Sequence, residues 1–404
     1  MRRPLRKPHG LALEDVQNYS GAPDYIIDLI DSNYVALNTS DGTIYKNTDY
    51  ATTLQTTIDA CPGCLLSPAT THNGAWIHNK FGHAYVSKQI SIEKCIRLTG
   101  NMKGWGTTLE LADNVDDIMF LINDTDTFHT YISDLNFCGN SANNNMGGEA
   151  LINSKGHIYM VDCYISDAES KGLEITDSNN VLDRITIYQC KGSGLKLGTV
   201  TDTKIVNSCF WGNSDFGVLT SMDHGFMIAC RIYLNGLDGI YMSGSQHTTI
   251  SNCNVRLNDE CGIYCDEIDF CSINNNLLAD NSQKTDNTYS AVQLLDSTYN
   301  VINGNVVYGT GAEEDHKYCF EESGGNCAFN QFCCNQAIGA ETGAYSIEAD
   351  SGSSINGHGT ESAAAETPQL AWPIGTIVDF TDSGDGSGDG IYIKDAAGNW
   401  DQLA

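Results

Sequence analysis

Four side chains able to do chemistry each follow a glycine by two residues and recur along the middle of the chain. They are Glu174, Lys196, Tyr241 and Tyr264, with Leu219 in the third place of the series, and neighbours lie 22 or 23 residues apart. A carboxylate and an ammonium group can transfer protons or bind a charged ligand. Tyrosine offers an apolar ring face for a sugar ring and a hydroxyl for its rim. We therefore predict a catalytic role for the first two side chains and substrate binding for the tyrosines, against the competing interpretation of an ordinary cross-strand ladder.

Three arginines stand out because the chain has only 21 Lys and Arg against 51 Asp and Glu. Arg231 and Arg256 are predicted as further catalytic residues, able to act as the base in a β-elimination. Arg184 is predicted to bind the carboxylate of a uronate. On an acidic surface arginines also neutralise neighbouring carboxylates, which is the alternative. The predicted site requires these arginines to lie beside the row of Glu174 and the tyrosines.

Two acidic segments could hold calcium, although neither has the spacing of a recognised site. Asp266, Glu267 and Asp269 either bind the ion together with main-chain oxygens or form a solvated turn. The segment TDSGDGSGDG, which lacks EF-hand spacing and fits a hairpin connection, contains Asp382, Asp385 and Asp389. No metal ligands are assigned, and calcium is the one cofactor that the sequence leaves open.

A repeat of 22 or 23 residues indicates the elements that position these side chains. One column pairs glycine with an apolar residue: Gly172-Leu173, Gly194-Leu195, Gly217-Val218, Gly239-Ile240 and Gly262-Ile263. A second column, eight or nine residues earlier, comprises Cys163, Ile185, Cys209, Cys230 and Cys253, followed two positions later by Ile165, Ile187, Trp211, Ile232 and Val255. A third column comprises Asn213, Asn235, Asn258 and Asn281. Three columns in register at this period predict the coils of a parallel β-helix.

Stacked coils explain the residue types of these columns. A lone coil cannot bury its inward side chains, whereas coils stacked about 4.8 Å apart bury a continuous apolar column. The column cysteines are therefore predicted to point inward as reduced thiols rather than to form a metal or redox site. The asparagines are predicted to form an amide ladder at a turn. Cys61 and Cys64 have CxxC spacing without a second pair, which indicates a Pro-Gly turn, with or without a disulfide.

The chain is predicted to be all-β, with about nine or more coils and a capping helix in front of them. Residues 1–44 form an N-terminal segment suited to attachment, and residues 45–357 form the β-helix with its cap. The helix is predicted in TTLQTTIDACPG from the spacing of its apolar residues. A Gly/Ser/Ala/Glu-rich linker follows over residues 358–370, and residues 371–404 form a small β unit.

The charge balance excludes several partners. A formal net charge of −30 repels a phosphate backbone, so nucleic acid is an unexpected partner. No run of 18 apolar residues could cross a bilayer as a helix. The basic start MRRPLRKPHG lacks a following apolar region, so no signal peptide is recognised. We expect an extracellular or virion-associated protein that is not exported by an ordinary signal peptide.

Two stretches give the chain a family likeness. The segment IDACPG leading into AYVSKQISI, and the segment LTGNMKGWGTTLEL, resemble the opening of pectate-lyase-like β-helix proteins. With the repeats, the likeness covers residues 45–357 and implies the right-handed pectin lyase fold. The superfamily includes polysaccharide lyases, glycoside hydrolases, epimerases and viral tailspikes, so the likeness is specific for fold.

The motifs of individual branches of this superfamily are not matched in a usable arrangement. Polygalacturonase-like hydrolases use motifs of the types NTD, DD and GHG, which occur here as Asn47-Thr48-Asp49, Asp116-Asp117 and Gly357-His358-Gly359. The first lies before the predicted coils and the last beyond them, so the three cannot meet on one flank. No segment matches the motif of calcium-dependent pectate lyases.

The sequence thus predicts a carbohydrate-active β-helix that binds a polysaccharide along its flank and cleaves it as a lyase or a glycoside hydrolase. The alternatives are a non-enzymatic tailspike or adhesin, in which a homotrimer is expected, and a structural surface protein.

Overall fold

The computed structural model describes most of the chain. The described residues are 23–61, 74–101, 106–123, 130–145, 147–285, 287–309, 316–349 and 351–356, together with the strands at 360–362, 377–381, 390–394 and 400–402. Cys64, Asp382, Asp385, Asp389 and the Gly357-His358-Gly359 motif lie outside the described residues, so their predicted roles stay predictions.

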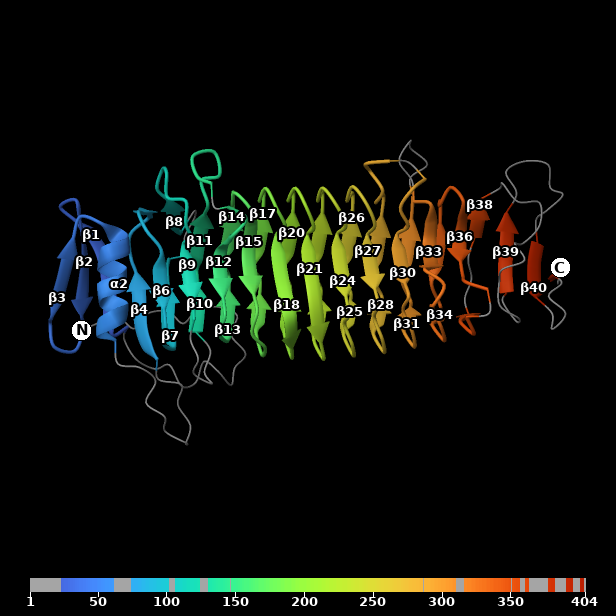
Figure 1. The fold of residues 1–404 in the computed structure, drawn as a ribbon, viewed down its shortest axis with the longest axis horizontal. Helices are drawn as coiled ribbons and strands as arrows, with labels where there is room; N and C mark the ends of the chain where they lie inside the picture. Colours follow the sequence, from blue (N-terminus) through green and yellow to red (C-terminus); the bar gives the residue numbers. More distant parts are fainter. Residues whose placement is uncertain are drawn as a thin grey trace, which may run out of the picture.

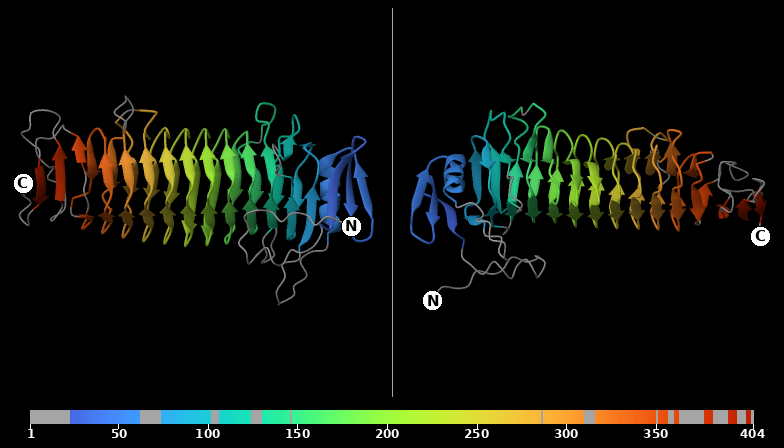
Figure 2. Two further views of the ribbon diagram at one scale, coloured as in Figure 1. Left: turned by 180° about the vertical axis from the view of Figure 1, so that it is seen from behind. Right: turned by 60° about the horizontal axis from the view of Figure 1, so that its bottom comes forward.

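Three long β-sheets run side by side along the molecule, and the chain visits them in turn (Figures 1 and 2). Within the coils, each strand pairs in parallel with the strand one coil later. The sheets are called A, B and C in the order in which the chain meets them within one coil. This arrangement confirms the predicted all-β parallel β-helix, and the eleven strands in each of sheets B and C meet the expected nine or more coils.

Sheet A has fifteen strands, in the order β3 (Ile44–Asn47), β2 (Asn33–Asn38), β1 (Tyr25–Ile30), β4 (Ala75–Asn79), β7 (Ile96–Thr99), β10 (Thr130–Ser133), β13 (Ile158–Val161), β16 (Val181–Asp183), β19 (Lys204–Val206), β22 (Phe226–Ile228), β25 (Thr249–Ser251), β28 (Ser272–Asn274), β31 (Val301–Asn303), β34 (Gln331–Cys333) and β37 (Ser354–Asn356). Strand β2 pairs antiparallel with both β1 and β3, and β1 pairs in parallel with β4.

Sheet B consists of β5 (His83–Val86), β8 (Thr107–Leu111), β11 (Leu135–Cys138), β14 (Tyr164–Ser166), β17 (Thr186–Tyr188), β20 (Cys209–Trp211), β23 (Arg231–Tyr233), β26 (Asn254–Arg256), β29 (Leu277–Ala279), β32 (Val306–Tyr308) and β35 (Gln336–Ile338). Sheet C consists of β6 (Ile90–Ile92), β9 (Phe120–Ile122), β12 (Ala150–Ser154), β15 (Lys171–Ile175), β18 (Leu195–Thr201), β21 (Val218–Asp223), β24 (Ile240–Ser243), β27 (Ile263–Asp266), β30 (Val292–Leu295), β33 (Tyr318–Ser323) and β36 (Gly343–Ser346).

The two ends carry different elements. The helix α2 (Tyr50–Ala60) lies at the N-terminal end, and its buried face includes Tyr50, Leu54 and Ile58. Asp49 caps it by accepting a hydrogen bond from the Thr52 amide. Towards the C-terminus, a four-stranded sheet contains β38 (Thr360–Ser362), β39 (Ile377–Thr381), β40 (Gly390–Lys394) and β41 (Trp400–Gln402). The predicted capping helix is therefore present, and the strands at its N-terminal side begin at Tyr25.

The predicted asparagine ladder occupies the corner between sheets B and C. The Nδ2 atoms of Asn213, Asn235 and Asn258 each donate to the Oδ1 atom of the next asparagine, at 3.0, 2.9 and 2.8 Å. All of these side chains are buried. The glycine column follows from the ladder, because a Cβ on Gly217 would lie 2.7 Å from the Asn235 amide nitrogen. The asparagine and glycine columns of the sequence thus belong to the same corner of each coil and depend on each other.

The cysteine column is correct except at one coil. Cys163, Cys230 and Cys253 are buried thiols, as predicted. In the coil between them Ser208 takes the column position and Phe210 points inward, so Cys209 and Trp211 face outward. The prediction aligned residues by type, whereas the position is set by the residue that follows the corner, where Asn207 has a φ of 53°. This shift by one residue moves Trp211 to the outer surface.

Candidate functional site

The outer face of sheet C carries the predicted row in full. Glu174 pairs in register with Lys196, Lys196 with Leu219, Leu219 with Tyr241, and Tyr241 with Tyr264. The side chains belong to β15, β18, β21, β24 and β27, which lie next to one another in Figure 1. In-register pairing of parallel strands stacks equivalent residues one coil apart. Sequence spacing alone therefore located this row correctly.

An ion-paired triad forms the N-terminal end of the row. One oxygen of Glu174 lies 2.8 Å from the Lys171 ammonium and the other lies 2.8 Å from the Lys196 ammonium. Burial raises the pKa of Glu174, but the hydrogen bonds and charges of the two lysines outweigh this, and its pKa is lowered. The carboxylate therefore stays ionised and occupied, which suits an ionic contact better than proton transfer.

Aromatic rings form the middle of the row. The rings of Tyr241 and Tyr264 stack with centroids 5.2 Å apart, and Phe216 lies 5.1 Å from Tyr241. The Tyr241 hydroxyl donates to Asp266 at 2.9 Å. Burial and the Asp266 carboxylate raise the pKa of Tyr241 to about 12. Both tyrosines remain partly exposed.

A second carboxyl group, which was not predicted from the sequence, lies at the same part of sheet C. Asp238 is 5% exposed and accepts a hydrogen bond from the Cys261 amide at 2.7 Å. Burial raises its pKa from 3.8 to about 7, and Glu260 adds to the rise. A carboxyl group that is half protonated near neutral pH is suited to general acid–base catalysis.

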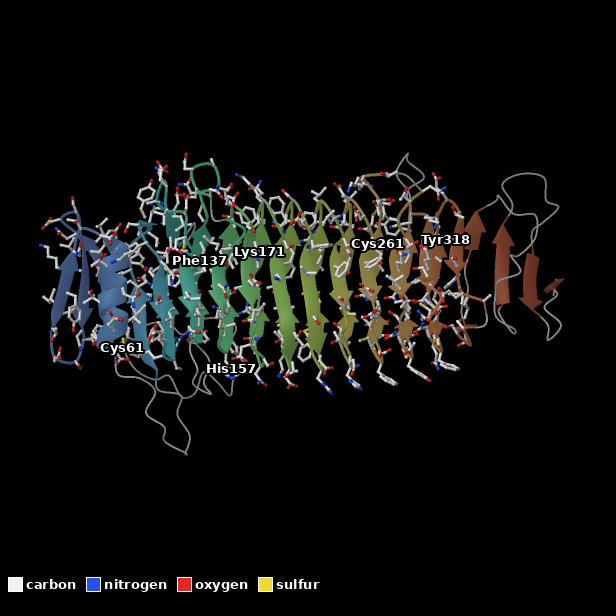
Figure 3. The ribbon with its side chains drawn as sticks, in the orientation of Figure 1. Cys61, Phe137, His157, Lys171, Cys261 and Tyr318 are labelled. Carbon is white, nitrogen blue, oxygen red and sulfur yellow. The ribbon has the colours of Figure 1, made fainter. Side chains whose placement is uncertain are left out.

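Asp238 lies close to the tyrosines. Its charge contributes to the raised pKa of both Tyr241 and Tyr264. It directly precedes Gly239 of the glycine column, and its carbonyl oxygen accepts a hydrogen bond from the Gly217 amide of the preceding coil. Figure 3 shows Lys171, Cys261 and Tyr318, at the edge where the strands of sheet C begin. A sequence signal existed, because Asp238 directly precedes Gly239, but nothing in the sequence indicated its burial.

The other carboxylates at this edge are already paired. Glu260 binds the ammonium of Lys284 at 2.8 Å and accepts from the Tyr289 hydroxyl at 3.2 Å. Glu321 accepts from the Ser290 hydroxyl at 2.6 Å and lies 3.3 Å from Lys317. Lys284, Tyr289 and Ser290 lie in the loop between β29 and β30, which rises above the shorter turns of the preceding coils (Figure 1). Asp238 therefore differs from its neighbours in having no ion-pair partner among the described residues.

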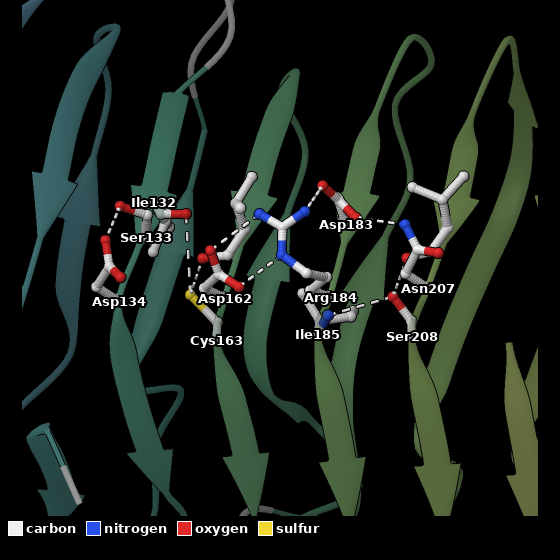
Figure 4. A network of polar contacts seen from close by, with 12 residues as sticks. Ile132, Ser133, Asp134, Asp162, Cys163, Asp183, Arg184, Ile185, Asn207 and Ser208 are labelled. Carbon is white, nitrogen blue, oxygen red and sulfur yellow. Dashed lines mark hydrogen bonds and ion pairs between the residues drawn. The ribbon is translucent and has the colours of Figure 1, made fainter. Parts of the chain in front are cut away.

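The three arginines do not join this row. Arg184 has a φ of 52° at the corner between sheets A and B, where its Nε and Nη2 atoms bind both oxygens of Asp162 at 2.7 and 2.9 Å and Nη1 binds Asp183 (Figure 4). Arg231 and Arg256 lie on β23 and β26 of sheet B. The alternation of residues along a strand predicts that a side chain points outward. It does not predict which sheet the strand joins, so the expected place of these arginines beside the row is wrong.

Sheet B carries an aromatic ladder of its own. Tyr188, Trp211 and Tyr233 stack with centroids 5.0 and 5.9 Å apart and nearly parallel planes. The guanidinium groups of Arg231 and Arg256 lie 6.0 and 5.6 Å from the Tyr233 ring. The arginines thus contact an aromatic ring rather than the residues of sheet C, and the ladder went undetected because Trp211 was assigned to the interior.

The calcium candidates do not converge. Asp266 accepts the Tyr241 hydroxyl, whereas Asp269 accepts a hydrogen bond from the Thr298 hydroxyl in the turn that follows β27. Glu267, between them, has a φ of 54°. Any calcium role of these residues remains a proposal.

Comparison with known proteins agrees with the architecture. A family model described as periplasmic copper-binding protein (NosD) matches residues 116–309. The mannuronan C-5 epimerase AlgE4 A-module of Azotobacter vinelandii is 16% identical, with a TM-score of 0.57, over 76% of this chain and 96% of that chain. The chain has the fold of a right-handed parallel β-helix. Tailspike protein 2 of an Escherichia coli O157:H7 bacteriophage is also similar to this β-helix, with 16% identity and a TM-score of 0.58 over 85% of this chain and 50% of that chain.

No curated protein sequence matches this chain. At 16% identity, the similar structures show its fold. Among the described residues, no helix has the length and apolar character needed to cross a membrane.

Proposed function

We propose that the chain binds a polysaccharide along sheet C and cleaves it by acid–base chemistry centred on Asp238 and Tyr241. The observation that carries this proposal is the stacked tyrosine pair beside a carboxyl group whose pKa is about 7. Tyrosine rings and polar rims suit sugar rings. A group that can both accept and donate a proton near neutral pH supplies the chemistry.

The two reaction classes use these groups differently. A lyase needs a base for the proton next to a uronate carboxylate and an acid for the leaving oxygen. A glycoside hydrolase needs a protonated carboxyl group and a second carboxylate. Asp238 and the Tyr241–Asp266 pair offer an acid and a base for either class. Lys171 and Lys196 would bind acidic sugar groups at the end of the row, with Glu174 holding both ammonium groups in place.

The similar proteins support a carbohydrate ligand. The A-module named above is an epimerase of mannuronan, and the tailspike belongs to a bacteriophage. An extracellular or virion-associated location would suit a polysaccharide ligand. The arginines of sheet B are a separate surface in this proposal and are not assigned to catalysis.

The proposal is tested by incubating the purified full chain with a panel of acidic and neutral glycans, with and without calcium. Absorbance near 235 nm reports unsaturated uronates and hence a lyase, whereas new reducing ends without absorbance report a hydrolase. Both Asp238→Asn and Tyr241→Phe should lower the rate at least about 100-fold.

Tyr233→Phe is the matched control, because it removes the same hydroxyl from the aromatic ladder on sheet B. It should leave the rate unchanged. Cleavage that survives in both sheet C variants, or that falls equally in the control, would refute the assignment of the centre. A lack of cleavage on every glycan would refute catalysis.

A non-enzymatic spike is the second candidate, favoured by the similarity to the tailspike over 85% of this chain. In that case the protein would bind a glycan without turnover and form a homotrimer. Sedimentation velocity at micromolar concentration distinguishes the two, because a monomer contradicts the spike.

A further inference from the structure

Two histidines and a carboxylate meet at the corner between sheets C and A. Asp223 ends β21, His224 follows it, and His247 occupies the equivalent corner one coil later. One ligand atom of each residue lies within 4.8 Å of the corresponding atom of the other two. None of these residues belongs to the predicted site. Their spacing in the sequence matches no recognised metal-binding motif.

The backbone fixes this arrangement. His224 and His247 have φ values of 51° and 52°, the left-handed conformation that turns the chain from one sheet to the next. Asp223 pairs in register with Gln246, the residue before His247. The imidazole rings stack with centroids 4.6 Å apart and planes 17° apart. The coil repeat therefore positions both rings over one carboxylate.

The Asp223 carboxylate faces both rings. Its Oδ1 atom lies 3.2 Å from His224 Nδ1 and 3.6 Å from His247 Nδ1. This oxygen is shielded from solvent, and none of the described residues makes a hydrogen bond to it. A shielded carboxylate oxygen without a hydrogen bond is costly unless another group compensates its charge.

These separations suit a metal ion. Zinc binds imidazole nitrogen at about 2.0–2.1 Å and carboxylate oxygen at about 2.0–2.2 Å, so tetrahedral ligand atoms lie roughly 3.3 Å apart. The two Asp223 distances bracket that value, and all three ligand atoms lie within 4.8 Å of one another. The imidazole rings would turn out of their stack to direct both nitrogen lone pairs at one ion. Two imidazoles and one carboxylate also leave a position open for water or another ligand.

A purely structural aromatic ladder explains less. The stack continues from His247 through Phe270, Tyr299 and Phe329, with centroids 5.5, 5.2 and 5.0 Å apart. Stacking alone requires rings, which phenylalanine and tyrosine supply in these later coils. Beside Phe270, the carboxylate in the Asp223 row is Asp269, which accepts a hydrogen bond from Thr298. Histidine rings thus occur in the two coils of this stack that lie beside the carboxylate oxygen without a hydrogen bond.

We propose that Asp223, His224 and His247 bind one divalent transition-metal ion. Imidazole and carboxylate ligands suit zinc, nickel or copper(II), whereas calcium prefers oxygen ligands alone. The site is independent of the proposed glycan cleavage, because it uses none of the residues assigned to that reaction.

The test is equilibrium dialysis of the metal-free full chain against zinc and nickel ions, with bound metal counted by mass spectrometry. His247→Phe is the main variant, because the next coil already carries phenylalanine at this position and the ring stack is preserved. It should lose one equivalent of bound metal. Asp223→Asn should weaken binding at that site by roughly tenfold or more. Binding of copper(II) should give a paramagnetic resonance spectrum with couplings to two imidazole nitrogens.

His83→Phe is the matched control. His83 lies 2.9 Å from Glu110 and so presents a histidine beside a carboxylate without a second histidine. It should keep the full number of equivalents. The proposal is overturned if wild type and both site variants bind equal amounts of metal with equal affinity, or if the control loses the same equivalent. Circular dichroism of each variant verifies folding, and Asp223→Asn alone decides the test if His247→Phe unfolds.

Discussion

Three carboxyl groups of sheet C show how environment decides chemistry at the scale of one residue. Glu174 is held ionised by two lysines, and Asp266 accepts a tyrosine hydroxyl. Asp238 has a backbone amide as its partner and is nearly buried, which disfavours its charged form. The proton that the proposed reaction needs therefore resides on Asp238.

Asp238→Asn should remove a pH dependence of stability. The folded-state pKa of about 7 exceeds the unfolded value of 3.8, so this group makes the protein less stable as pH rises from about 4 to about 7. The asparagine keeps the acceptor for the Cys261 amide. From pH 5 to pH 8, the free energy of unfolding of the variant should rise relative to wild type by about 3 kcal/mol. Urea unfolding at both pH values measures this, and parallel profiles would contradict the raised pKa.

Single-residue roles were only partly predictable from the sequence. Alternation within a strand correctly placed Tyr241 and Tyr264 on an outer face. Arg231 and Arg256 show the same alternation, yet they lie on sheet B, because strand pattern gives direction and not sheet membership. Arg184 occupies a left-handed corner that favours no arginine in particular, so its pairing with Asp162 could not be foreseen. Burial of Asp238 depends on packing between coils, which no local pattern records.

At the scale of the element, the asparagine ladder joins successive coils and ends on a histidine. The backbone amide of Asn281, the last asparagine of the ladder, donates to Nε2 of His316 at 3.0 Å. His316 is fully buried, and burial lowers its pKa from 6.5 to about 4. It therefore accepts this bond as a neutral imidazole. Protonation would replace the acceptor with a second donor.

His316→Gln should reduce acid sensitivity. The unfolded chain gains a proton on this histidine below pH 6.5, whereas the folded protein does not until about pH 4, so stability is lost as pH falls through this window. Between pH 7 and pH 4.5 wild type should lose about 2 kcal/mol more than the variant. Chemical unfolding at the two pH values tests this. Equal losses would show that His316 is protonated in the folded state.

Elements were the most predictable level of the structure. Glycine, cysteine and asparagine recur in these columns because the same steric or hydrogen-bonding requirement returns in successive coils. Gly217 shows why, since any side chain there would strike Asn235 of the next coil. The exception at Cys209 arose because the cysteine of this coil does not occupy the column position of the other cysteines. Matching the size of the inward side chains between coils would have selected Phe210 instead.

At the scale of the whole molecule, the net charge of −30 works against the compact state through self-repulsion. Raising sodium chloride from about 0.01 M to about 1 M shortens the screening length from roughly 30 Å to roughly 3 Å. The midpoint of thermal unfolding should therefore rise by several degrees. Choline chloride is the control, because its large cation excludes specific binding, and it should give the same rise. A constant or falling midpoint in both salts would contradict dominant repulsion.

The central claim is that a glycan lies along sheet C, and calorimetric titration tests it most directly. The glycan that gives the strongest signal in the panel is titrated into wild type, Tyr264→Ala and Tyr233→Ala. Loss of a stacked ring on sheet C should weaken binding roughly tenfold, whereas the sheet B variant should bind like wild type. Weakened binding confined to Tyr233→Ala would place the glycan on sheet B. Either that result or unchanged binding by Tyr264→Ala would contradict the account.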